Sequence, residues 1–192
     1  GLFSSGGVHA HQDHIIYFAN LIASEGICVN LHLFLDGRDV PPKRAIADIK
    51  ELEIALHKLV QVVTIIGRFY AMDRDNRWDR IEKAYNLLAL GLGQRFDTPE
   101  AAILSNYKNG ETDEFVQPSV IRSYDGISKN SDGIFFMNYR SDRAREILSA
   151  LCDPNFNKFR RRKQFSLVSR SGLIEYSKDH NNFMENVFSQ ES

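Results

Sequence analysis

The chain has 192 residues, of which 43% are hydrophobic and 26% are charged, which is enough for one compact core. Its 24 basic residues nearly balance its 25 acidic residues, which argues against a surface that coats nucleic acid, because such surfaces need a basic excess over a whole face. No apolar run is long enough to cross a membrane, so a single soluble domain over residues 1–192 is expected.

The cysteines and the first residues predict the compartment and the extent of the chain. Cys28 and Cys152 are far apart, and Cys28 falls in a run expected to form a buried strand, so two free thiols in a reducing cytoplasm are expected. Residues 1–3 resemble the end of a strand whose beginning is missing, and no signal or transit pattern follows. The chain is therefore expected to be a fragment of a longer polypeptide.

The first third of the chain alternates between helix and strand patterns. Residues 12–24 carry one apolar stripe before a capping Gly26, which predicts a helix, and residues 28–35 form a nearly continuous apolar strand. Pro41 and Pro42 are expected in the first turn of a second helix. The buried side of that helix is expected to carry Ile46, Ile49, Leu52, Leu56 and Leu59.

An arginine-rich stretch occupies the middle of the chain. A buried strand over residues 62–66 leads into residues 67–80, which read as a loop with four arginines and three aspartates. A helix over residues 76–90 follows and is expected to stop at Gly91 and Gly93. Clustered arginines suggest an anionic ligand, and a solvated, salt-bridged loop is the alternative.

The next elements are shorter. Thr98 as a cap and Pro99 at the first helical position predict a helix that stops near Gly110. Residues 115–128 are interpreted as an extended segment with a turn at Asp125–Gly126, forming a hairpin.

The last part of the chain is predicted to hold two more strands. A buried strand over residues 133–137 precedes a helix that runs to Leu151, with Ser141 as its cap. A final strand is expected over residues 165–168. The tail beyond Ser171 is polar and is not assigned.

The repeated order of strand, loop and helix predicts an α/β fold, with a mostly parallel sheet, helices on both faces and a three-layer α/β/α arrangement. Ligands of such sheets bind beyond the carboxyl ends of the strands, where the strand-to-helix loops gather. Those loops are predicted to form a pocket for a small acidic metabolite. The residues they carry are His9, Arg38, Asp39, Arg68, Arg74, Arg140 and Arg143.

Asp39 is the candidate catalytic residue. Among arginines it is a poor base in the empty site, and the charge of a bound ligand would offset their field and let Asp39 accept a hydroxyl proton. The alternative is that Asp39 only orients Arg38 or caps the following helix.

A histidine-rich stretch offers a second interpretation. His9, His11, Asp13 and His14 fit an H-x-H-x-D-H pattern, which resembles the zinc-ligand motif of metallo-β-lactamase-like hydrolases. No second ligand set is evident, because His32, His57 and His180 fall in a strand, a helix and a polar tail. His11 and His14 are therefore interpreted as helix-start or surface histidines, and no metal ligand is assigned.

Five motifs together resemble a known family over nearly the whole chain. They are SGGVH at 5–9, FLDGRDVPP at 34–42, GRFYAMDRDNRW at 67–78, TDEFV at 112–116 and NYRSDRA at 138–144. They closely resemble the cofactor-independent (2,3-bisphosphoglycerate-independent) phosphoglycerate mutases.

The resemblance implies most of the inserted transferase domain, which holds the substrate of a cytoplasmic glycolytic isomerase. Those enzymes interconvert 3-phosphoglycerate and 2-phosphoglycerate through a phosphoserine, with two manganese ions in a separate phosphatase-like domain. It implies substrate binding by the seven loop residues named above, proton transfer by Asp39 and no bisphosphoglycerate requirement. The partners it implies are the small substrate and the chain's own phosphatase-like domain, with no nucleic acid and no membrane.

Two positions depart from the family pattern, and larger parts are missing. Ser5 replaces an aspartate and Ser141 replaces a proline, and either change could reshape a loop. The nucleophilic serine, the metal ligands and a later active-site lysine are not in this chain. The chain alone is therefore expected to bind phosphoglycerate weakly and to show no turnover with manganese present.

A non-catalytic anion- or nucleic-acid-binding module is the remaining alternative. It would use the basic run 160–163 with Phe159 and Phe165. A solvated turn before an edge strand explains the same run, and the neutral total charge favours that explanation.

Overall fold

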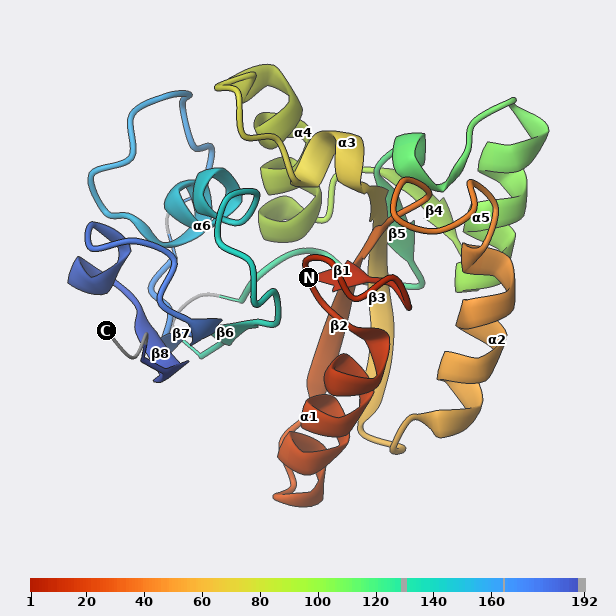
Figure 1. Cartoon of the computed structure of the whole chain (residues 1–192), viewed down its shortest axis with the longest axis horizontal. Coiled ribbons are helices and arrows are strands. Elements are labelled where there is room, and N and C mark those ends of the chain that lie inside the picture. Colours follow the sequence, from red (N-terminus) through yellow and green to blue (C-terminus); the bar gives the residue numbers. More distant parts are fainter. Residues whose placement is uncertain (129–130, 164, 190–192) are drawn as a thin grey trace.

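The computed structural model describes residues 1–128, 131–163 and 165–189, and its strands form two sheets (Figure 1). In the larger sheet, in the order β1-β2-β3-β5-β4, the first three strands are parallel, β5 is antiparallel to β3, and β4 is parallel to β5. Its strands are β1 (Leu2–Phe3), β2 (Val29–Leu35), β3 (Val60–Gly67), β4 (Gln94–Phe96) and β5 (Ser119–Ile121). The smaller, parallel sheet contains β6 (Gly133–Phe136), β7 (Ser169–Ile174) and β8 (Glu185–Phe188).

The α/β class is confirmed, but the predicted strand at 133–137 does not join the first sheet. It begins the second sheet as β6, which pairs with β7. Leu2 N donates to Asn138 Oδ1 at 2.9 Å, and Tyr139 N donates to the His9 carbonyl at 2.9 Å. The two sheets therefore meet where the loops after β1 and β6 run side by side.

Helices cover both faces of the larger sheet, because successive strand residues point to opposite sides. Phe34 and Ile66 pack in one core with α4 and α6, while Leu33 and Ile65 pack in another with α1, α2 and α5. Burying each such side chain contributes roughly 1.5–3 kcal/mol. The helices are α1 (Gln12–Ser24), α2 (Ala45–Ala55), α3 (Arg68–Ala71), α4 (Trp78–Leu90), α5 (Pro99–Lys108) and α6 (Arg145–Cys152), with 3₁₀ turns η1 (Asp113–Phe115) and η2 (His180–Asn182).

Two helix predictions are confirmed at their ends. Thr98 Oγ1 accepts a hydrogen bond from Ala101 N at 3.1 Å, as a helix cap should. The helix α4 ends at Gly91, whose φ of 63° is the left-handed conformation that suits glycine. None of the helices in residues 1–128, 131–163 and 165–189 is long and apolar enough to span a bilayer.

The predicted start of the second helix is wrong, because a distant side chain sets it. Asp113 Oδ2 accepts from Ala45 N at 2.9 Å, and α2 begins there, three residues after Pro42. The helix ends at Ala55, so Leu56 and Leu59 lie beyond it, although both pack partly against the core.

The arginine-rich stretch is not a single loop. Its residues 68–71 form α3, and the next residues fold around the buried Asp73. Asp73 Oδ2 accepts from Asp75 N at 3.0 Å and from Arg77 N at 2.9 Å. These bonds delay the start of α4 to Trp78.

Several other local predictions are wrong. There is no hairpin at 115–128, because β5 pairs with β3 and with β4, a strand not predicted. Ser141 does not cap α6, which begins at Arg145 without a side-chain cap. The last predicted strand begins at Ser169 instead of residue 165, and the tail forms η2 and β8, although residues 190–192 lie outside the described ranges. Both cysteines are free, but Cys28 precedes β2 and is exposed, whereas Cys152 is buried.

Candidate functional site

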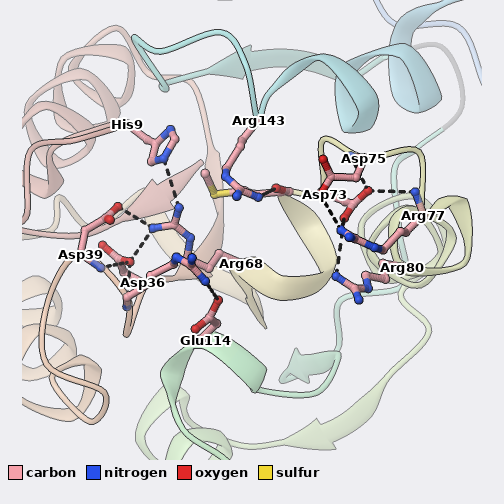
Figure 2. Close-up of polar contacts among 12 residues, drawn as sticks. His9, Asp36, Asp39, Arg68, Asp73, Asp75, Arg77, Arg80, Glu114 and Arg143 are labelled. Carbon is pink, nitrogen blue, oxygen red and sulfur yellow. Dashed lines mark hydrogen bonds and ion pairs between the residues drawn. The ribbon is translucent and has the colours of Figure 1, made fainter.

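A cavity of about 320 Å³ lies where the loops after β2, β3 and β6 meet (Figure 2). The predicted residues Arg38, Arg68, Arg74 and Arg143 line it, which agrees with the expected meeting of these loops. His9, Asp39 and Arg140 do not line it: His9 and Asp39 contact the lining residue Arg68, and Arg140 contacts Asp142, which binds the lining residue Arg74. The complete lining consists of Arg38, Arg68, Phe69, Asp73, Arg74, Asp75, Arg77, Arg80, Glu114 and Arg143.

Arg68 is the centre of a buried hydrogen-bond network, so its guanidinium is not fully available to a ligand. It is 4% exposed, and its Nη1 donates to Asp36 Oδ1 at 2.7 Å and to Asp39 Oδ2 at 2.5 Å. Its Nη2 lies 3.1 Å from His9 Nε2. Burial alone would lower the pKa of Arg68, but the two carboxylates raise it. Most of its donors are therefore occupied before any ligand arrives.

Asp36 fixes the turn that carries Arg38 and Asp39. This carboxylate is 2% exposed and accepts from Ser4 Oγ at 2.6 Å, Arg38 N at 3.2 Å and Asp39 N at 3.0 Å. Burial would raise its pKa, but hydrogen bonds from Asp39 N, Ser4 and Arg68 outweigh burial and lower it. Asp36 belongs to the motif at 34–42, but the sequence alone predicts no role for it.

His9 lies behind Arg68 in a defined tautomer. An arginine nitrogen can only donate, so His9 Nε2 must accept, which places the ring proton on Nδ1. That nitrogen lies 3.6 Å from Asp142 Oδ1. Burial first, and then the Arg68 charge, lower the pKa of His9. The fold therefore favours a neutral imidazole.

We expect His9 to make the protein sensitive to acid. Because its pKa is lowered in the folded state, the unfolded chain takes up a proton first, near pH 6.5, and stability falls as the pH drops below that value. The loss should reach up to about 1.4 kcal/mol per pH unit. Urea unfolding at pH 7.5 and 5.5 should show a smaller loss for His9→Gln than for the wild type, while the exposed His14→Asn keeps the wild-type loss.

Asp142 joins two of the predicted arginines. Its Oδ2 accepts from Arg74 Nη1 at 2.7 Å, and its Oδ1 lies 3.1 Å from Arg140 Nε. Burial would raise the pKa of Asp142, but the hydrogen bond from Arg74 and the charge of Arg140 lower it. Arg140 is thereby held close to the cavity without lining it.

Arg143 supplies uncompensated positive charge. Its Nη1 donates to the Met72 carbonyl at 2.9 Å, and within residues 1–128, 131–163 and 165–189 no carboxylate oxygen lies within 4 Å of its guanidinium. Burial, followed by the charges of Arg74 and Arg68, lowers the pKa of Arg143. An anion placed beside Arg143 would relieve that repulsion.

Two cavity arginines had no predicted role. Arg77 Nη1 binds Asp73 Oδ1 at 3.0 Å and Asp75 Oδ2 at 2.6 Å, and the Arg80 guanidinium stacks 3.7 Å from the centre of the Phe69 ring. Both belong to the arginine-rich stretch, so their count was visible in the sequence. Their inward direction depends on the fold around Asp73.

The histidine-rich stretch does not converge on a metal. His9 faces Arg68, while the side chain of His11 accepts a hydrogen bond from Asp13 N at the start of α1. In the described part of the chain, no group of three or more His, Cys, Asp or Glu residues is placed to hold a metal ion. The metallo-β-lactamase-like interpretation therefore has no support from the fold.

The basic run 160–163 has structural contacts. Arg161 Nη1 donates to the Asp153 carbonyl at 2.9 Å just past α6, and Lys163 Nζ donates to the Ile127 carbonyl. Phe159 packs edge-on against Tyr85, with 5.4 Å between ring centres. These contacts favour the solvated turn over a nucleic-acid surface.

Comparison with known proteins gives consistent matches. The family model "BPG-independent PGAM N-terminus (iPGM_N)" matches residues 1–178. The chain is 44% identical over 188 residues to a 2,3-bisphosphoglycerate-independent phosphoglycerate mutase of Dinoroseobacter shibae, covering 98% of this chain and 37% of the relative. The corresponding protein of Escherichia coli O1:K1 / APEC is 46% identical over 186 residues, covering 93% and 36%.

A solved structure agrees with these matches. Leishmania mexicana phosphoglycerate mutase, crystallised at low cobalt concentration, superposes with a TM-score of 0.87 and 28% identity, over 96% of this chain and 36% of that one. The chain thus spans little more than a third of the length of the relatives it matches.

Proposed function

The chain belongs to the family of BPG-independent phosphoglycerate mutase N-terminal regions, and from this membership and the arginine-lined cavity we propose that it binds phosphoglycerate. It would be the substrate-binding part of a mutase, an isomerase of glycolysis and gluconeogenesis that interconverts 3-phosphoglycerate and 2-phosphoglycerate in the cytoplasm. The observation that carries the proposal is the cavity in which Arg143 has no carboxylate partner among the described residues.

The charge of the cavity suits this ligand. Six arginines and three carboxylates line it, and Asp36, Asp39 and Asp142 bond to Arg68 and Arg74 from outside the lining, so that in the described part of the chain Arg143 is the lining arginine without a carboxylate partner. A phosphoglycerate carries roughly three negative charges at neutral pH, from one phosphate and one carboxylate. Guanidinium groups bind both through charge-assisted, often bidentate hydrogen bonds. Phosphoryl transfer chiefly requires such positioning and charge neutralisation.

Each predicted site residue receives a specific role in this proposal. Arg38, Arg74 and Arg143 would contact the acidic groups of the ligand directly. Arg68 would present its remaining donors while holding His9 and Asp39 in place. Arg140 would be positioned by Asp142 and reach the ligand from the rim. Asp39, held by Arg68, would accept a proton from the glycerate hydroxyl.

The rest of the reaction would belong to another part of a longer protein. We propose that a phosphatase-like domain supplies the serine that becomes phosphorylated, as well as the two manganese ions. The part of this chain that the structure describes offers no ligand set that fits those ions. The relatives' name, 2,3-bisphosphoglycerate-independent, supports a reaction without that cofactor.

Calorimetric titration with 3-phosphoglycerate tests the proposal. The wild-type chain should bind weakly, and Arg143→Ala should weaken binding about tenfold or more, because a charge-assisted hydrogen bond contributes about 1.5–3 kcal/mol. Arg162→Ala removes an exposed arginine of the basic run and should leave binding unchanged. Absence of wild-type binding, or an equal loss in both variants, would contradict the proposal.

A further inference from the structure

The motif at residues 112–116 places an acidic side chain inside the anion site. Glu114 lines the cavity on the side of Arg68 (Figure 2). Its Oε1 lies 3.4 Å from Arg38 Nη1. The Glu114 side chain is 17% exposed and the Arg38 side chain 62% exposed. A carboxylate in this place opposes the binding of any acidic ligand, so its presence needs an explanation.

The backbone around Glu114 is held from both sides. Asp113 N donates to the Pro42 carbonyl at 2.8 Å, and the Val116 carbonyl accepts from Gly67 N at 2.8 Å. The buried Asp113 carboxylate accepts from Ala45 N at 2.9 Å and also from Tyr107. Glu114 is therefore fixed to the start of α2 and to the end of β3.

Two glycines let this segment approach the binding loops. A Cβ on Gly37 would lie 2.8 Å from Glu114 N, and a Cβ on Gly67 would lie 2.1 Å from the Glu114 carbonyl oxygen. Each glycine directly precedes an arginine of the site, Arg38 or Arg68. The fold thus sets the place of the Glu114 carboxylate beside Arg38, whose largely exposed side chain is freer to move.

We propose that Glu114 is an internal competitor for Arg38. In the empty site it occupies the guanidinium that an acidic group of the ligand takes, and it keeps Arg38 at the cavity rim. The ligand must displace this contact, so the ground-state complex is looser than the arginines alone would make it. Loose binding of the ground state leaves binding energy for interactions that are made only in the transition state. This inference rests on the proposed function, because it assumes an acidic ligand.

Titration of Glu114→Gln with 3-phosphoglycerate tests the inference. The amide keeps the shape but removes the charge, so binding should tighten about two- to fivefold, the range expected for an exposed ion pair. The gain should disappear in the Arg38→Ala background, because no competition remains there. Glu111→Gln, a nearby carboxylate outside the cavity, should leave binding unchanged.

Each result has a definite meaning. Unchanged or weaker binding by Glu114→Gln, together with normal wild-type binding, would overturn the inference but keep the proposed function. A gain that persists without Arg38 would also overturn it, since Glu114 would then act through the general field of the cavity. If neither the wild type nor the variant binds, the proposed function fails, and the inference fails with it. A tighter-binding variant cannot result from mere structural damage.

Discussion

Replacing Arg68 by alanine should lower the free energy of unfolding by about 3–5 kcal/mol. The substitution leaves Asp36, which is 2% exposed, without the guanidinium that balances its charge, and it removes a partner from Asp39 and His9. Urea unfolding at pH 7 measures the change. Since free energies of unfolding of domains are typically about 5–15 kcal/mol, the variant should lose a large share of its stability.

Matched variants separate this effect from simple loss of charge. Arg38→Ala also removes a cavity arginine, but one whose side chain is 62% exposed, and it should cost less than about 1 kcal/mol. Adding Asp36→Asn to Arg68→Ala should restore part of the lost stability, because the unpaired charge is gone. If Arg68→Ala and Arg38→Ala cost the same, the buried network is not important for folding. Loss of binding by Arg68→Ala would have two causes, so Arg143 is the cleaner ligand probe.

Gly67→Ala should cost about 3 kcal/mol and also disturb the cavity. The φ of Gly67 is −69°, so backbone conformation is not the obstacle. The added methyl would instead lie 2.1 Å from the Glu114 carbonyl oxygen and 2.8 Å from Val116 N, and backbone atoms cannot rotate away. The segment that carries Glu114 must move, together with the end of β3 that precedes Arg68.

Gly133→Ala is the matched control for this substitution. It also adds a methyl to a strand glycine, and its nearest neighbour would be Ser169 Cβ at 3.4 Å, an ordinary contact. Thermal unfolding should show a large drop for Gly67→Ala and a small change for Gly133→Ala, and 3-phosphoglycerate should bind more weakly to the former only. Equal drops would show that the close approach at Gly67 relaxes without cost.

Local patterns predicted the elements that local chemistry determines. The stripe of residues 12–24 and the Thr98–Pro99 start of α5 were found because cap, turn and apolar spacing lie within a few residues of each other. The start of α2 depends on Asp113, 68 residues away, and the division into two sheets depends on which strands pair. Contacts between residues far apart in the sequence produce no local sequence pattern from which they could be predicted.

The same distinction applies to the site. The general rule for the carboxyl ends of parallel strands, together with the motif resemblance, indicated which arginines gather, even though β6 belongs to the second sheet. Neither the rule nor the motifs predicted that Arg68 donates hydrogen bonds to Asp36 and Asp39, or that Glu114 lines the cavity. The contacts of Arg68 with Asp36 and Asp39, and of Arg38 with Glu114, join residues that are 29 to 76 positions apart in the sequence. Such contacts become visible only in the three-dimensional structure.

The cavity draws its arginines from both sheets, and this has a mechanical consequence. Arg68 follows β3 of the larger sheet, whereas Arg143 follows β6 of the smaller one, and the Asp142–Arg74 pair bridges the same gap. A ligand held by both arginines would link the two sheets. A ligand that binds only the folded chain raises its free energy of unfolding. Binding of a small acid would therefore also hold the two sheets together.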